Sequence, residues 1–171
     1  MKKVQNKIVI TLILFIFIVL LRVQFNWCHN ITSAHSNAGD LAECMPLSPV
    51  ALKSSMRPVP GEVVEVDTQG LVRKCRAANS PYVVGIVSTN PAHVLRDKIK
   101  DSVPIALSCV VLCKVTNEHG MIKPGDLLVS ASKPGYAMKA SQPFIPGTII
   151  GKALDAQDSE EGIVLVLVMM R

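Results

Sequence analysis

The sequence predicts an all-β domain, a compact barrel or sandwich of many short strands, behind an N-terminal transmembrane or signal helix and a flexible linker. From about residue 60 on, short apolar and β-branched runs alternate with turns that contain Gly or Pro. Only one stretch of that region has a helical pattern, and closely spaced strands with so little helix indicate a barrel or a sandwich. We therefore divide the 171 residues into a membrane segment (1–25), a linker (26–59) and a β-rich domain (60–171).

Turn residues separate the expected strands of the domain. Asp67-Thr68-Gln69-Gly70 joins two short runs that we expect to form a hairpin, and Lys123-Pro124-Gly125-Asp126 has Pro and Gly at the central positions of a type II turn. The final run is continuously apolar, which predicts a strand buried on both faces. The expected strands are Val63–Val66, Leu71–Cys75, Tyr82–Val87, one long bent strand or two strands within Val103–Val115, then Leu127–Ser130, Tyr136–Lys139, Thr148–Leu154 and Ile163–Met170.

One segment of the domain has a helical pattern. Asn90 suits an N-cap, Pro91 suits the first helical position, and Ala92–Lys100 contains helix formers. Because the segment is short, a loop with a single turn is an equal alternative.

The N-terminus has the pattern of a membrane-targeting segment. Met1–Lys7 carries three lysines and no acid, and Ile8–Leu21 is apolar except for Thr11. An all-round apolar helix is hard to bury in a soluble domain of this size. The lysines should stay inside, which places the C-terminal region outside the cytoplasm.

Cleavage of this segment is open between two alternatives. The apolar run would span only about 21 Å as a helix, shorter than a bilayer core, which favours a cleaved signal peptide. Arg22–Trp27 then follows, where signal peptidase needs small residues, and Phe25 and Trp27 suit a membrane interface. We expect a retained anchor, with secretion after cleavage as the alternative.

The cysteines and the linker offer no clear site. The linker is rich in Ser, Asn, Ala and Pro. Five cysteines leave at least one without a partner in the same chain: Cys28, Cys44, Cys75, Cys109 and Cys113. In one strand, Cys109 and Cys113 would lie about 13 Å apart, too far for a disulfide. We expect the last three cysteines to act as small apolar core residues.

Charge argues against a nucleic-acid partner. The formal net charge is +5, but four basic residues precede the first acid, Asp40. From Arg57 onward the chain has 13 basic and 11 acidic residues, and few aromatic residues for base stacking. We therefore expect no nucleic-acid binding.

No catalytic, cofactor or metal motif stands out in the domain. His93 and His119 both lie in expected loops, and no Gly-x-Ser-x-Gly elbow, HExxH, P-loop or EF-hand is present. The acidic turn Asp155–Glu161 lacks the spacing of a calcium loop, so we expect a solvated loop. We expect no cofactor and no metal, and the weak catalytic candidates are Asp158 and Ser159 alone.

Four segments of the domain have sequence motifs that are more specific than their composition. They are Val83–Pro91, Val103–Ser108, Gly125–Ala140 and Gly147–Leu154. In this order they resemble a β-rich domain of phage tail-fibre and appendage proteins and of bacterial surface proteins, similar to the peptidase G2 intramolecular chaperone autocleavage domain. The resemblance covers about Gly61 to Val168. It implies an all-β fold, trimerisation and cleavage of the folded chain.

This chain departs from that family in two respects. It has Asp158 before Ser159, whereas cleavage in such domains is expected at a Ser-Asp junction, and a membrane leader stands where a fibre would precede the domain. We therefore expect a membrane-anchored or secreted non-enzymatic β-domain with a structural, assembly or adhesion role, open to forming a homo-oligomer. The alternative is a self-cleaving or intramolecular-chaperone domain.

Overall fold

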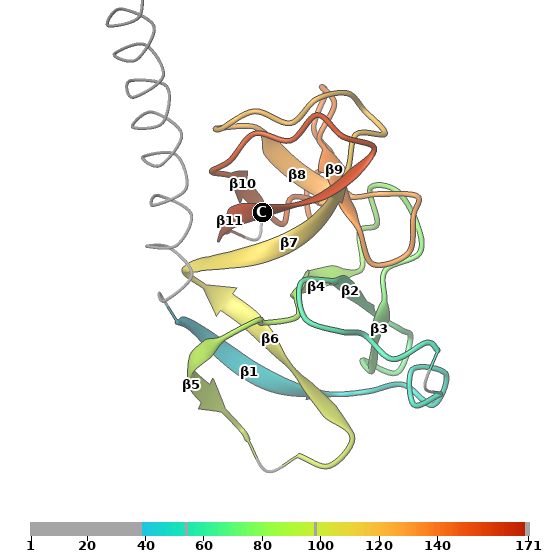
Figure 1. Cartoon of the computed structure of the whole chain (residues 1–171). Coiled ribbons are helices and arrows are strands. Elements are labelled where there is room, and N and C mark those ends of the chain that lie inside the picture. Colours follow the sequence, from blue (N-terminus) through green and yellow to red (C-terminus); the bar gives the residue numbers. More distant parts are fainter. Residues whose placement is uncertain (1–38, 54, 98, 170–171) are drawn as a thin grey trace, which may run out of the picture. The chain divides into compact units, whose positions relative to one another are not determined.

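The computed structural model describes residues 39–53, 55–97 and 99–169, and within these ranges the protein is all-β (Figure 1). This confirms the all-β part of the predicted fold class. The membrane segment, Cys28 and linker residues 26–38 lie outside the described ranges. Inside them, none of the chain forms a helix of the length and apolarity that a membrane span requires.

The strands form two small sheets and a closed barrel. Each sheet has three strands, and the barrel has five. The first sheet has the order β5 (Pro91–Leu95), β1 (Asp40–Pro46), β6 (Ser102–Ser108), and the second has the order β3 (Val72–Lys74), β2 (Val63–Val66), β4 (Val83–Ile86). The barrel has the order β10 (Gly151–Ala153), β11 (Glu161–Val168), β7 (Val110–Thr116), β9 (Ala137–Lys139), β8 (Leu127–Ser130).

A single bend carries the chain from the first sheet into the barrel. The apolar run Val103–Val115, expected as one bent strand or two, forms two strands, β6 and β7, on either side of Cys109. Cys109 has a φ of 77°, in the left-handed region, which breaks the extended backbone. Its carbonyl accepts a hydrogen bond of 3.0 Å from the Val168 amide, so the bend is tied to β11.

Both predicted turns are confirmed. β2 and β3 pair antiparallel around Asp67–Gly70, and the Asp67 carboxylate accepts hydrogen bonds from the Gln69 and Leu71 amides. In the other turn, Gly125 has a φ of 95° and the Asp126 amide donates to the Lys123 carbonyl at 3.0 Å. That geometry is a type II turn, which requires a positive φ at its third residue.

The linker prediction is wrong for the part of it that the structure describes. Asp40–Pro46 is not a loop but β1, the central strand of its sheet, paired parallel to β5 and antiparallel to β6. Alternate residues of β1 are buried, including Ala42 and Cys44. The charged residues of β1, Asp40 and Glu43, are three positions apart. This spacing does not show that every second residue of the strand is buried.

The prediction of a helix or a loop over Ala92–Lys100 is wrong for its first part, whereas the described residues after Leu95 form turns as the loop alternative expected. Pro91–Leu95 is β5, an edge strand of the first sheet. Pro91 is its first residue, a position where a missing backbone N–H costs no ladder hydrogen bond. His93 is therefore on an exposed strand and not in a loop.

The last strand differs in part from the prediction. β11 is buried on both faces only at Val164, Leu165 and Val166. Toward its ends the inward side chains stay buried, whereas Ile163 is 59% exposed and Leu167 is 40% exposed. A barrel strand shows one face to the core and one to the outside, because side chains alternate along it.

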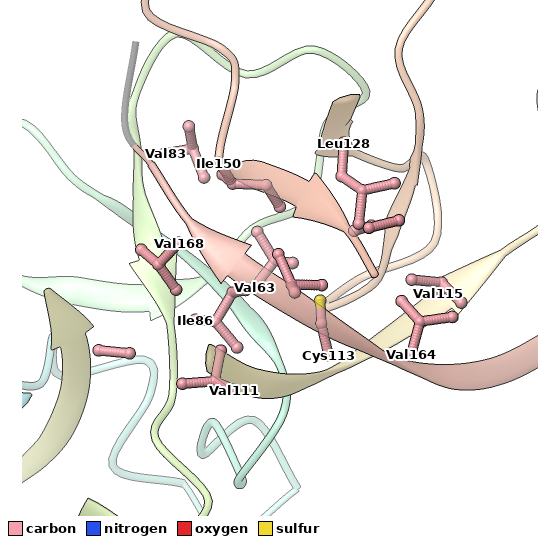
Figure 2. Packing of buried hydrophobic residues seen from close by; sticks show 14 of the residues in the cluster. Val63, Val83, Ile86, Val111, Cys113, Val115, Leu128, Ile150, Val164 and Val168 are labelled. Carbon is pink, nitrogen blue, oxygen red and sulfur yellow. The ribbon is translucent and has the colours of Figure 1, made fainter. Parts of the chain in front are cut away.

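The main core fills the barrel and continues onto the second sheet (Figure 2). Val111, Cys113 and Val115 of β7 meet Val164 of β11 there, and Val63 and Ile86 join them from β2 and β4. A second apolar cluster joins residues of the first and second sheets, among them Val72 of β3 and Ile105 of β6, together with Leu47. The inside of the barrel is therefore filled by apolar side chains, so we look for a binding site on its outer surface.

Candidate functional site

The outer side of β11 carries an exposed apolar row. Val164, Val166 and Val168 point into the barrel core, so Ile163, Leu165 and Leu167 point outward. Leu165, at the centre of the row, is only 6% exposed, whereas Ile163 and Leu167 on either side of it are exposed.

Neighbouring strands extend this row sideways. Leu112 of β7 lies opposite Leu165 in the antiparallel ladder, and the Leu154 amide donates to the Leu165 carbonyl from the other side at 2.8 Å. Leu112 and Leu154 are each 36% exposed. We call the five residues Ile163, Leu165, Leu167, Leu112 and Leu154 the outer apolar face. Exposed apolar side chains that gather on neighbouring strands in this way can mark an interaction site.

A lysine lies at the Leu167 end of the outer apolar face, and a turn rich in acidic residues leads from β10 into β11. Lys152 of β10 lies opposite Leu167, and it has no ion pair among the described residues. The turn from β10 to β11 begins at Asp155, whose carboxylate accepts the Leu165 amide at 3.0 Å, and it also carries the exposed acids Asp158 and Glu160. Glu161 is paired with Lys133, and the Lys133 hydrogen bond lowers the pKa of that carboxyl.

An apolar cleft of about 460 Å³ adjoins the lysine end of the face. Phe144 and Ile145, from the exposed loop after β9, form one side of it, and Leu127 and Lys152 lie on β8 and β10. The remaining lining residues are Pro146, Ile149 and Met169. The sequence did not predict this cleft, because its walls come from three segments whose apolar residues are unremarkable separately.

A second hollow of about 420 Å³ shares Leu127, Phe144 and Lys152 with the cleft and has a polar wall. In that wall the Asp126 carboxylate accepts the Lys123 amide at 2.8 Å and meets the Lys139 ammonium at 2.9 Å. Partial burial raises the pKa of Asp126, but the Lys139 ammonium and the Lys123 amide outweigh it and hold the pKa below its usual value. Lys139 is thus engaged in an ion pair.

The buried charges serve the fold. Glu62 is 4% exposed and bridges the ammonium groups of Lys74 and Lys114 at 3.1 and 3.0 Å. Glu65 accepts hydrogen bonds from Arg73 and Ser80, at 3.0 and 2.9 Å. The sequence did not single out these carboxylates, and the valines beside them, in and next to β2, are a weak signal of burial.

The domain cysteines divide into buried and exposed thiols. Cys75 and Cys113 are buried, as expected for core residues, whereas that expectation is wrong for Cys109, which is exposed at the bend. Burial raises the pKa of the Cys113 thiol to about 12 and also raises that of Cys75. Cys44, Cys75, Cys109 and Cys113 are all free thiols.

The weak catalytic candidates lie in an exposed turn. Asp158 and Ser159 precede β11, and the Asp158 carbonyl accepts the Asn117 side-chain amide at 3.2 Å. No hydrogen bond joins either of their side chains to a base within the described ranges. The structure therefore does not bring them into a nucleophile–base pair.

One serine–histidine pair was missed by sequence analysis. His119 is exposed in its turn, as the sequence suggested, and its Nδ1 lies 3.1 Å from the Ser141 hydroxyl. The neighbouring Glu118 carboxylate accepts the Ser132 amide at 3.0 Å and does not orient the imidazole. A hydrolytic triad needs a base oriented by a third group, and this pair lacks one among the described residues. In those same ranges, no three metal-ligating side chains come together.

No protein-family model matches this chain, and no curated protein matches it.

Proposed function

We propose that this protein is a non-enzymatic β-domain with a structural or assembly role, held at a membrane with the domain outside the cytoplasm or secreted. The outer apolar face is the observation that carries the proposal. Exposed leucine and isoleucine side chains on regular barrel strands present a rigid surface to a protein partner. The engagement of other ionisable groups supports this, since the buried Cys113 thiol is held protonated and the carboxylates of Glu62 and Glu65 are in ion pairs.

Site-specific photo-crosslinking tests the assembly role. A photoreactive phenylalanine at position 163 of the full chain, expressed in cells, should form adducts on illumination. The same residue at position 82 is the matched control, because Tyr82 is 63% exposed but belongs to neither β11 nor its neighbours. Adducts from 163 and none from 82 are expected. Absence of adducts at 163 would refute the proposal.

Self-cleavage is the second candidate, and it rests on the resemblance to phage appendage domains. The Asp158–Ser159 sequence lies in an exposed turn, where a chain cut can be accommodated. Intact mass of the refolded full chain, followed over hours, separates the two candidates. We expect an unchanged mass. A time-dependent cut that Asp158→Ala or Ser159→Ala abolishes would establish the self-cleaving function instead.

A further inference from the structure

We propose that the apolar cleft beside Lys152 binds a free fatty acid, with the acyl chain in the cleft and the carboxylate at the Lys152 ammonium. This is a ligand site in addition to the proposed assembly role, and it does not depend on that role. It follows from three observations: the lining of the cleft, the polar hollow that adjoins it, and the position of Lys152 where the two meet.

The cleft has the size and the lining of a site for an apolar ligand. Its volume of about 460 Å³ falls within the range of about 300–1,000 Å³ that is usual for small-molecule sites. All of its lining residues except Lys152 are apolar. Phe144 and Ile145 in its wall are exposed, so an acyl chain that covers them removes apolar surface from water.

Backbone contacts hold the walls of the cleft in place. The buried Thr148 hydroxyl donates to the Ile145 carbonyl at 2.7 Å, which closes the loop that forms one wall. The Ile150 amide donates to the Leu128 carbonyl at 3.0 Å, and the Met169 amide donates to the Ile150 carbonyl at 3.2 Å. Walls that are already formed lower the entropic cost of binding an acyl chain.

The polar hollow places charged groups next to the apolar cleft. The two share Leu127, Phe144 and Lys152. The charged residues that line either of them are Asp126, Lys139 and Lys152, which together carry a charge of +1 at neutral pH. Since Asp126 and Lys139 are paired at 2.9 Å, the excess positive charge lies at Lys152. A ligand with an apolar chain and one negative charge matches this combination.

Lys152 lies where the head group of such a ligand must sit. Its backbone is held in β10, opposite Leu127 of β8 and Leu167 of β11. The side chain is half-buried, and it forms no ion pair within the described ranges. A carboxylate beside a partly desolvated ammonium forms a strong charge-assisted hydrogen bond. A neutral alcohol loses the charge, and an amine is repelled, so the site should select a carboxylate.

Photolabelling of the full chain in nanodiscs of phosphatidylcholine tests the site. The probe is dodecanoic acid with a diazirine at the end of its chain, and peptide mapping by mass spectrometry locates the adducts. Saturable labelling is expected on residues 144–149 and on Met169. The same chain carried by dodecanol should need a concentration at least about fivefold higher for half-saturation, because it lacks the charge.

Variants separate the two parts of the ligand. Lys152→Gln should raise the half-saturating concentration of the acid by about tenfold and leave that of the alcohol unchanged. Lys53→Gln, a change at an exposed lysine outside both hollows, is the matched control and should alter neither. Ile145→Ser should weaken both probes by at least about threefold, since it removes apolar contact with the chain.

Reversal of the charge at Lys152 keeps the test independent of any loss of folding. Lys152→Glu should abolish labelling by the acid and should favour the same chain carried by dodecylamine, which the wild type binds poorly. A disturbed fold would lose all three probes, whereas a switch of preference requires an intact cleft. Far-ultraviolet circular dichroism of each variant checks the secondary structure.

Three results would overturn the proposal. The first is the absence of saturable labelling in the cleft, and the second is equal labelling by the acid and the alcohol. The third is labelling only when phosphatidylglycerol of the nanodisc carries the diazirine chain, which would show contact with a bilayer and not uptake of a free fatty acid. The crosslink from position 163 reports on the assembly role separately, so failure of one proposal leaves the other standing.

Discussion

Glu62 is the residue on which three segments converge. Its carboxylate holds the ammonium groups of Lys74 and Lys114, and it accepts the Val59 amide at 3.0 Å. Removing one member of a buried ionic group leaves the others desolvated and unpaired, which costs more than the group contributes when it is complete.

Glu62→Gln should therefore lower the free energy of unfolding by about 1–3 kcal/mol, the lower part of the range for buried pairs because both lysines are partly exposed. Urea denaturation measures the change. The control is Glu43→Gln, whose partner Arg96 is largely exposed, and its effect should stay within about 0.5 kcal/mol. Equal effects for the two variants would contradict this account of Glu62.

The thiols should differ sharply in reactivity. A pKa of about 12 leaves the Cys113 thiol almost wholly protonated at pH 8, and the thiolate is the reacting species. Exposed Cys109 should be alkylated by iodoacetamide at least about 100-fold faster than Cys113. Peptide mapping by mass spectrometry assigns each site. Addition of denaturant should equalise the two rates, and rapid labelling of Cys113 in the folded chain would show that the barrel core opens readily.

At the scale of elements, the bend at Cys109 separates β6, which belongs to the first sheet, from β7, which belongs to the barrel. A non-glycine residue in the left-handed region costs about 1–2 kcal/mol, and a β-branched residue fits it worst. Cys109→Val should lower the free energy of unfolding by about that amount. Cys109→Gly should match or slightly exceed the wild type. Thermal unfolding of the three chains ranks them, and a valine variant as stable as the glycine variant would argue against strain at the bend.

The type II turn before β8 should carry a pH-dependent part of the stability. The pKa of Asp126 in the folded chain lies below its unfolded value, so its contribution is present above the unfolded pKa and is lost as the pH falls through the folded pKa. Asp126→Asn should lower the free energy of unfolding by about 1 kcal/mol at pH 7. The difference from the wild type should shrink as the pH falls toward the folded pKa. A difference that is constant with pH would contradict a role for the Asp126 charge.

The elements also show what the sequence could and could not predict. Hairpins and turns depend on local signals, and Asp67–Gly70 and Lys123–Asp126 were predicted correctly for that reason. β1 and β5 could not be predicted, because they gain their stability from pairing with each other and with β6 across a long separation in the sequence. The outer apolar face could not be recognised in the sequence, because β11 is a continuous apolar run. Its inward and outward residues are of the same chemical type.

At the scale of the whole molecule, β1 makes the segment before residue 60 part of the folded domain. Among the residues that the structure describes it is the strand that joins β5 and β6, and Leu47 and Ala51 after it belong to the second apolar cluster. A chain that lacks residues 1–38 keeps this sheet, whereas a chain that lacks residues 1–59 loses its central strand. Exposed edges of β5 and β6 would then be left without partners.

We therefore expect the shorter deletion to leave a cooperative urea transition and the longer one to abolish it or to reduce its m value, which scales with the surface exposed on unfolding. A second variant separates loss of β1 from loss of chain length: Ala42→Glu, in the otherwise intact chain, places a carboxylate at a fully buried position of β1. It should destabilise the domain by at least about 3 kcal/mol. If the chain that begins at residue 60 unfolded as cooperatively as the intact one, β1 would be an addition to the domain and not its central support.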